Sequence, residues 1–193
     1  PQMEKRGKII EKHTKLETLY KLLSGNMSGN RMDLETYVQR YYLEKILYAA
    51  NRRFADMSAG QFELRMVDEE NAGKGKNRGL DLMVYSNVTG KEREVRTLSG
   101  GESFMAALAL ALGMADQIQE SSAAIHLDVM FIDEGFGSLD AQSRQQAIEV
   151  LAELAGDSRM VGIISHVTEL KEQIDRKLVV SRTDKGSRAV WTE

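Results

Sequence analysis

Hydrophobic residues recur at helical spacing from the first residues of the chain. Residues 1–23 are rich in Lys and Glu and carry Ile9, Leu16, Leu19 and Leu23 in a partial heptad pattern. A coiled coil of this length is not stable alone, so the pattern predicts the stump of a longer one. The alternative is an ordinary amphipathic helix that packs on its own domain. A start at residue 1 inside a charged helix also leads us to expect a fragment of a longer protein.

A second helical pattern covers residues 34–57. Residues 24–30 contain Gly, Ser and Asn and break the preceding helix, and Asp33 is a suitable N-cap for the next one. The second helix is apolar on two nearly opposite sides, so we expect it to lie between two layers, with its tyrosines in the core rather than stacked on bases. One stripe is Leu34, Tyr37, Val38, Tyr41 and Tyr48, and the other is Leu43, Leu47, Ala50 and Phe54.

The hydrophobic pattern then changes to the alternation typical of strands. Residues 62–67 and 80–85 alternate apolar and polar side chains and predict an antiparallel hairpin. The loop between them contains GKGK at residues 73–76, which lacks the spacing, the Ser or Thr and the following helix of a phosphate-binding loop. We therefore expect a flexible loop, whose Lys74, Lys76 and Arg78 offer at most weak contacts to a nucleic-acid backbone.

The last part of the chain alternates helix and strand, as in a parallel α/β sheet. The apolar pattern predicts a helix over 102–119, strands over 127–132, 160–165 and 177–182, helices over 141–155 and 167–175, and a short edge strand over 189–192.

Composition excludes several classes of protein. The formal net charge of −3 excludes a uniformly basic nucleic-acid coat, and the absence of cysteine excludes disulfides and thiolate metal sites. The three histidines, His13, His126 and His166, lack the spacing of a zinc site. No apolar stretch is long enough to span a membrane and no signal peptide opens the chain, so we expect a cytoplasmic protein without a membrane partner.

The motif LSGGE at residues 98–102 opens the predicted helix over 102–119. Free backbone N–H groups and the helix dipole favour negative charge there, Gly100 and Gly101 permit close approach of a phosphate, and Ser99 adds a hydroxyl donor. The same letters also form a capping box, because Ser99 and Glu102 are three residues apart. Taken alone, the motif favours a purely structural helix start.

An apolar strand that ends in two acids strengthens the functional interpretation. Residues 129–132 lead into Asp133 and Glu134, and buried strands rarely end in unpaired charges. We expect Asp133 to hold Mg²⁺ and Glu134 to orient and deprotonate an attacking water. The sequence SLD ends downstream at Asp140, and His166 ends the next strand, where it reaches the same edge.

Together, LSGGE, the strand with Asp133 and Glu134, SLD and His166 resemble the signature, Walker B, D-loop and switch histidine of ABC-type ATPase heads. The wording RTLSGGESF, DEGFGSLD and GIISHVTELKE resembles the SbcC family, ATPase subunits of the SbcCD nuclease that processes DNA ends. The resemblance extends from about residue 34. It implies an α/β, P-loop NTPase-like fold with a mostly parallel sheet, of which this chain is the C-terminal half. Residues 1–24 would be the coiled-coil stump and 25–193 the lobe.

The resemblance also implies ATP and Mg²⁺ as cofactors and a dimer of heads. Ser99 and Gly101, with Gly100 and Glu102, would face the nucleotide of a second head. Asp133, Glu134 and His166 would serve the nucleotide of their own head, and Asp140 would reach across the dimer. Further implied partners are an SbcD-like nuclease subunit and double-stranded DNA ends. The 193 residues contain no G-x-x-x-x-G-K-[ST] loop, so the N-terminal half of the head is an implied partner too, and the chain alone is expected to be inactive.

Three alternatives remain at this point. A head of the SMC or RecN type shares LSGGE and a coiled coil, although Gly135-Phe136-Gly137 after the acids favours SbcC. A transporter nucleotide-binding domain usually has Pro after the glutamate and a P-loop in the same continuous domain. A non-catalytic interaction module would use only the coiled-coil stump.

Overall fold

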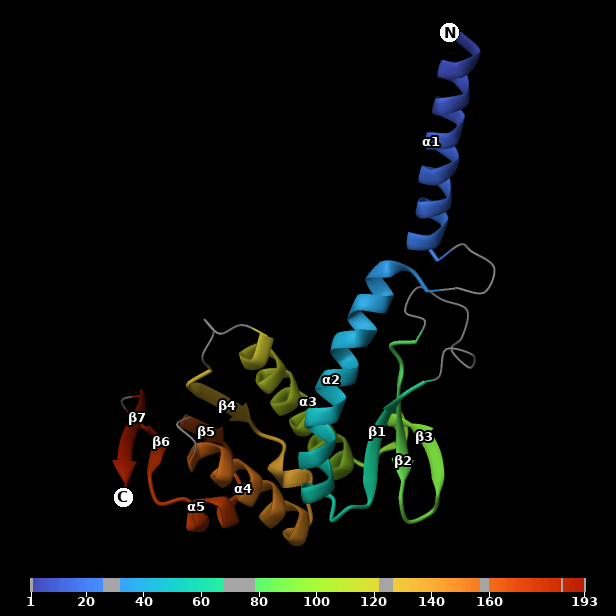
Figure 1. The fold of residues 1–193 in the computed structure, drawn as a ribbon. Coiled ribbons are helices and arrows are strands. Elements are labelled where there is room, and N and C mark those ends of the chain that lie inside the picture. The colour runs from blue at the N-terminus through green and yellow to red at the C-terminus, as the bar shows by residue number, and fades with distance from the viewer. Residues whose placement is uncertain are drawn as a thin grey trace.

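The computed structural model describes residues 2–25, 32–67, 79–121, 127–156, 160–184 and 186–192. Helix α1 (Gln2–Leu23) projects away from the rest of the molecule, with exposed apolar side chains such as Ile9, Leu16 and Leu19 (Figure 1). The expected helix over 1–23 is confirmed, whereas its role as a coiled-coil stump stays a prediction. The loop motif GKGK with Arg78, and His126, lie outside the described residues.

Helix α2 (Leu34–Met57) begins where the capping chemistry predicts. The side chain of Asp33 accepts a hydrogen bond from the Thr36 N–H at 2.7 Å. The helix packs closely against α3 (Gly100–Ser121) because Gly113 has no side chain. A Cβ at Gly113 would lie 2.6 Å from the Ile46 carbonyl oxygen and 2.9 Å from the Ala50 nitrogen. The core lies along this contact, where Ala50 and Phe54 are fully buried.

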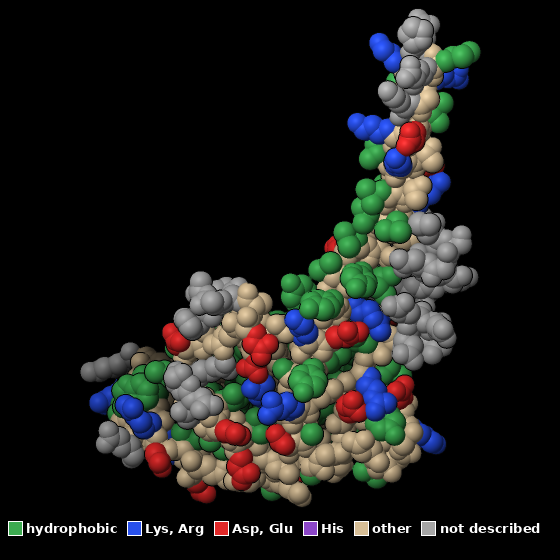
Figure 2. Space-filling model, viewed as in Figure 1, with side chains coloured by type: hydrophobic (Ala, Val, Ile, Leu, Met, Phe, Trp, Pro, Cys, Tyr) green, Lys and Arg blue, Asp and Glu red, His purple; other side chains and the backbone are tan. Residues whose placement is uncertain are grey.

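One expectation about α2 is wrong. Apolar side chains are buried on only one side of the helix, because α3, β1 and α4 cover only the face with Leu47, Ala50 and Phe54. Tyr37 and Tyr48 are 62% and 78% exposed, so the tyrosine stripe lies largely on the surface. Hydrophobic side chains consequently gather on the surface of the arm formed by α1 and the start of α2 (Figure 2). The other exposed members of the stripe are Leu34, Val38 and Tyr41.

The predicted hairpin is confirmed and gains a third strand. Strand β1 (Phe62–Met66) pairs antiparallel with β2 (Leu82–Ser86), with the buried Leu64 opposite Val84. Strand β3 (Lys91–Glu94) adds to β2 and leads through a 3-10 turn, η1 (Val95–Thr97), into α3. Its sequence KERE has no apolar alternation because β3 is largely exposed, so the hydrophobic pattern did not reveal it.

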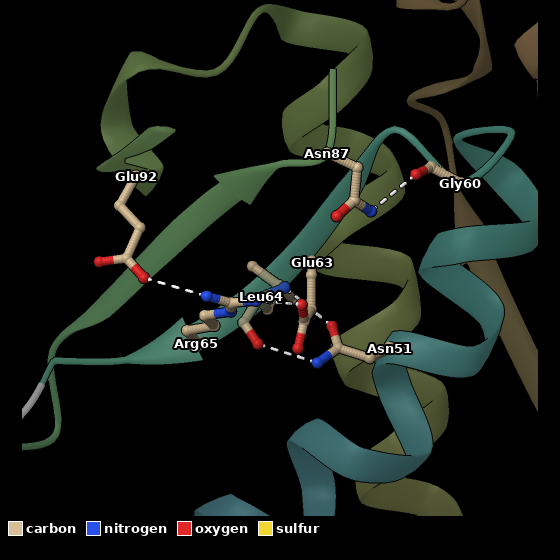
Figure 3. A network of polar contacts seen from close by, with 7 residues as sticks. All are labelled: Asn51, Gly60, Glu63, Leu64, Arg65, Asn87 and Glu92. Atoms are coloured by element: carbon tan, nitrogen blue, oxygen red, sulfur yellow. Dashed lines mark hydrogen bonds and ion pairs between the residues drawn. The ribbon is translucent and has the colours of Figure 1, made fainter. Parts of the chain in front are cut away.

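Asn51 joins α2 to this sheet. Its side-chain amide donates to the Leu64 carbonyl and accepts from the Leu64 N–H, both at 2.8 Å (Figure 3). On the neighbouring part of the sheet Arg65 pairs with Glu63 and Glu92, and Asn87 donates to the Gly60 carbonyl (Figure 3). The sheet that leads into α3 is therefore fixed to the helix that supports α3.

Among its described residues, the alternating part of the chain contains one parallel pair of strands. Strands β4 (Val129–Asp133) and β5 (Met160–Ile164) pair in parallel, and the chain between them forms η2 (Phe136–Ser138) and α4 (Ala141–Gly156). After α5 (Thr168–Gln173), strand β6 (Lys177–Thr183) pairs antiparallel with β7 (Gly186–Thr192) and not with β5. The expectation that the third predicted strand continues the parallel sheet is therefore not met among the described strands. The short GSRAVW sequence after a turn instead provides a hairpin partner.

Strand β4 is also less buried than its apolar sequence predicts. Ile132 is buried, but Phe131 is 70% exposed and its ring lies against Gly162 of β5. Met160 and Ile164 of β5 are exposed as well. One face of this two-stranded sheet therefore lacks a covering layer in the described part of the chain. No helix among the described residues has the length and apolarity needed to cross a membrane.

Candidate functional site

The signature turn at residues 98–102 is a capping box in the structure. The Ser99 N–H donates to the Glu102 carboxylate at 2.8 Å, and the Glu102 N–H donates to the Ser99 hydroxyl at 3.2 Å. Arg93 of β3 adds an ion pair to the same carboxylate at 3.0 Å and donates to the Thr97 carbonyl. The structural interpretation of the motif is thus confirmed, and Ser99 and Gly100 remain on the surface, where a ligand can reach them.

The two glycines of the signature lie against the segment that ends in Asp140. A Cβ at Gly101 would lie 2.9 Å from the Ser138 carbonyl oxygen and 3.4 Å from Leu139, and one at Gly100 would touch Ser138. The sequence interpretation gave these glycines a role in approaching phosphate. The structure adds a second reason, because at Gly101 only glycine lets α3 begin this close to the segment after η2.

Strand β4 delivers its two acids to the edge of the parallel sheet. Asp133 lies opposite Ile164 in the register, and the Glu134 N–H donates to the Ile164 carbonyl at 2.8 Å. The Glu134 carboxylate and the His166 imidazole approach to 3.6 Å, although both side chains are well exposed. The expected convergence of Glu134 and His166 from neighbouring strands therefore occurs in the structure.

Glu134 has an unusual backbone conformation. Its φ is +58°, a left-handed value that non-glycine residues rarely adopt, and Gly135 follows at +93°. Phe104 of α3 lies over Gly135, where a Cβ would collide with the phenyl ring. Phe104 also packs edge-to-face on the fully buried Phe136, with ring centroids 5.0 Å apart. The turn that carries Glu134 therefore packs against α3, which we call the signature helix because it begins in the signature turn.

Asp140 is the N-terminal cap of α4. Its carboxylate accepts from the Ser143 N–H at 2.9 Å and from the Ser143 hydroxyl at 2.8 Å. The backbone hydrogen bond from Ser143, and then the hydroxyl one, hold the pKa of Asp140 below its ordinary value. Arg144, one residue further, donates to the Leu139 carbonyl at 2.9 Å and pairs with Glu169 at 3.5 Å. This arginine joins the loop after β4 to the segment that follows His166.

The described residues contain no group of three or more His, Asp or Glu side chains that could hold a metal ion. Asp133 and Glu134 nevertheless offer exposed hard oxygen atoms at the sheet edge. Mg²⁺ in nucleotide sites is usually bound by one or two protein carboxylates, substrate phosphates and waters. The donor set therefore fits a magnesium ion that arrives with a nucleotide, and it does not form a metal site on its own.

Three residues of this region were not singled out from the sequence: Arg93, Phe104 and Arg144. Arg93 belongs to a strand without apolar alternation, and Phe104 looks like any core residue of an apolar helix. Arg144 carries no motif. The positive φ at Gly135 and the Phe104 ring over it both explain why a glycine follows the two acids, and the sequence contains no direct signal of either.

A groove of about 560 Å³ lies elsewhere, between α2, α3 and α4. None of the predicted site residues lines it, so it is separate from the signature and from the acidic edge. Its lining mixes tyrosines with both signs of charge, including Tyr41, Tyr48, Arg53 and Asp116, of which Arg53 and Asp116 form an ion pair at 2.6 Å.

Comparison with known proteins shows which proteins this chain is similar to. Curated relatives that are named as the C subunit of the nuclease SbcCD are 45% identical over 185 residues in Vibrio cholerae, 39% over 191 residues in Lactococcus lactis and 44% over 177 residues in Treponema pallidum. The alignments cover 93%, 95% and 92% of this chain, but only 18%, 18% and 17% of the relatives. The chain thus spans less than a fifth of the length of these proteins.

Solved structures share the fold. A chain from a study of ATP-driven dimerization and DNA-stimulated activation of SMC ATPases aligns with a TM-score of 0.63 at 18% identity, over 82% of this chain and 89% of that one. An Smc head domain with an extended coiled coil from Pyrococcus furiosus, bound to the C-terminal domain of ScpA, aligns with a TM-score of 0.62 at 21% identity, over 98% of this chain and 43% of that one. At these identities the likeness shows the fold alone, and it confirms the expected ATPase-head architecture.

The family assignment rests on the region that contains the site. Residues 52–153, more than half of the chain, match the family described as "SbcC/RAD50-like, Walker B motif". This region includes the signature turn, the acidic strand end and Asp140, and it ends before His166. The resemblance seen in the sequence is therefore confirmed, and the chain belongs to the SbcC/RAD50-like Walker B family.

Proposed function

We propose that this chain is the C-terminal lobe of an ATPase head whose other lobe supplies the phosphate-binding loop. The observation that carries the proposal is the convergence of Glu134 and His166, 3.6 Å apart, beside Asp133 at the open edge of a parallel pair of strands. Ligands of open α/β sheets bind at this edge. On the same lobe, an exposed helix start provides a second, separate phosphate contact.

The acidic edge would serve the nucleotide of its own head. Asp133 holds the magnesium ion, which neutralises charge on the phosphates when it is bound. Glu134 orients the attacking water and accepts its proton, and His166 donates a hydrogen bond to the γ-phosphate. The exposed positions of all three side chains suit residues that meet a substrate from outside the lobe.

The signature turn would face the nucleotide of a second head. Ser99, Gly100 and Gly101, with Glu102 holding the turn, contact the γ-phosphate there, and Asp140 reaches across the interface. ATP then bridges two heads, so it favours the closed dimer, and hydrolysis releases it. The uncovered face of β4 and β5, with Phe131 70% exposed, supports a further contact with the N-terminal half of the same head.

The family and the relatives' name support a role in DNA processing. We propose that the complete protein is an SbcC-like subunit that controls an SbcD-like nuclease at double-stranded DNA ends. Within it, residues 1–24 form the base of a coiled coil and residues 25–193 form the lobe. Co-purification of the complete protein with a metallophosphoesterase would support this role, whereas a stable partnership with chromosome-organising proteins would favour an SMC-type function.

The substitution Glu134→Gln tests the proposed base. In the head assembled from this lobe and a P-loop lobe, the variant should nearly abolish ATP hydrolysis while ATP-dependent dimerisation persists, because glutamine keeps the shape but cannot take the proton. Steady-state phosphate release and size-exclusion chromatography with ATP measure the two effects. This chain without the P-loop lobe should show no turnover. Unchanged hydrolysis by Glu134→Gln, or turnover by this chain alone, would contradict the proposal.

A further inference from the structure

The signature helix and the turn that carries Glu134 share one buried contact. Phe104 lies two residues after the signature, and its ring lies over Gly135 and against Phe136. Phe136 is fully buried, so the ring pair belongs to the core rather than to a mobile surface. The contact joins two segments that, under the proposed function, serve two different nucleotides.

The turn that carries Glu134 has backbone angles that need support from neighbouring residues. Glu134 has φ of +58° and Gly135 has +93°, values that cost free energy and persist only where neighbours hold them. One such neighbour is the Ile164 carbonyl, which accepts from the Glu134 N–H. A second is the Ser138 hydroxyl, which donates to the Gly135 carbonyl at 2.7 Å, and a third is Phe104, which fills the place of a side chain at Gly135. The loss of the ring would leave a void in which the turn relaxes to ordinary backbone angles.

We infer that Phe104 is a positioning residue, through which the signature helix controls the placement of the Glu134 carboxylate. The inference rests on the proposed function and adds to it the residue that supports the catalytic turn. Gly101 lets α3 begin against the Ser138 carbonyl, Phe104 braces Gly135, and Glu134 is held toward the water of its own nucleotide.

A first experiment uses this chain as it is. Hydrogen–deuterium exchange of the segment 131–138 reports on the Glu134 N–H, whose bond to Ile164 depends on the turn. Phe104→Ala, and Phe104→Leu as the milder change, should speed exchange of this segment by about 10-fold or more, because local opening becomes easier. The matched control is Leu110→Ala, a partly buried position about 9 Å further along the same helix, which should leave the segment unchanged. Equal exchange in Phe104→Leu and the control would overturn the inference.

A second experiment separates positioning from simple destabilisation. In the assembled head, Phe104→Leu should lower kcat by about 10- to 100-fold, since a misplacement of about 1 Å has such an effect, while ATP-dependent dimerisation and KM stay near wild type. Leu110→Ala should keep its kcat. If wild-type heads hydrolyse ATP and Glu134→Gln does not, but Phe104→Leu matches the control, the inference fails and the proposed function survives. If wild-type heads show no ATP hydrolysis, the proposed function fails on its own.

Discussion

At the scale of single residues, the glycines of the site have packing reasons that their motifs do not reveal. Gly101 leaves room for the Ser138 carbonyl, and Gly135 leaves room for Phe104. From the sequence alone, we expect Gly101 only to permit the close approach of a phosphate, and Gly135 only helps to distinguish the SbcC family from the SMC and RecN types. The convergence of Glu134 and His166 at one edge of the sheet was predictable because each follows a recognisable apolar run. The packing of their supports was not, because it depends on contacts distant in sequence.

Substitution of Gly135 tests this packing. Gly135→Ala places a Cβ against the Phe104 ring at a φ of +93°, so it should destabilise through both strain and overpacking. Gly60→Ala is the matched control, because Gly60 has φ of +72° and open space around it. The control should lose about 1 kcal/mol from the left-handed backbone, and Gly135→Ala about 1–3 kcal/mol more, in urea unfolding. Equal losses would show that Phe104 does not press on Gly135.

At the scale of elements, local signals predicted helices better than their surroundings. Helix α2 follows its expected bounds because Asp33 caps it and the apolar period is clear. The tyrosine stripe of this helix is exposed rather than buried, because the period of apolar residues identifies a face of the helix but not what covers that face. Strand β3 was missed because KERE has no apolar residue to bury. In both cases the missing information concerns contacts outside the element.

Asn51 gives a direct measure of how α2 holds the sheet. Asn51→Ala leaves the N–H and the carbonyl of Leu64 without their partner, at a residue that is 1% exposed. We expect a loss of about 2–4 kcal/mol in the free energy of unfolding, because each unpaired buried group is costly. Asn87→Ala removes a single exposed hydrogen bond to Gly60 and should cost less than about 1 kcal/mol. Similar losses for the two variants would contradict this role of Asn51.

The two capping aspartates lead us to expect that the folded chain loses stability as the pH falls into the acid range. Backbone hydrogen bonds, from Thr36 and from Ser143, hold the pKa values of Asp33 and Asp140 below their ordinary value of 3.8. A lowered pKa stabilises the folded chain above the ordinary value, and this contribution is lost as pH falls through the folded value. Asp33→Asn and Asp140→Asn keep a cap without the titration, so stability measured from about pH 5 to about pH 2 should fall less steeply than in wild type. An unchanged slope in both variants would contradict the assignment.

At the scale of the whole molecule, several regions carry apolar surface that the described residues leave uncovered. Two of them are the arm of α1 and the start of α2, and the face of β4 and β5 with Phe131. Contiguous exposed apolar surface of this kind marks interaction sites. The sequence predicted partners through its family resemblance, but the location of these two surfaces became clear only from the structure.

The central claim is that one lobe serves two nucleotides, and mixed dimers test it most directly. Heads with Ser99→Arg lose the signature contact, and heads with Glu134→Gln lose the base, so each should be inactive alone. In a mixed dimer, one site keeps both an intact Glu134 and an intact Ser99 from opposite heads. Mixing equal amounts should therefore restore about a quarter of wild-type ATP hydrolysis, as expected for a two-fold dimer with two equivalent sites. If the mixture stays inactive while mixed dimers form, Ser99 and Glu134 serve the same nucleotide, and the account is wrong.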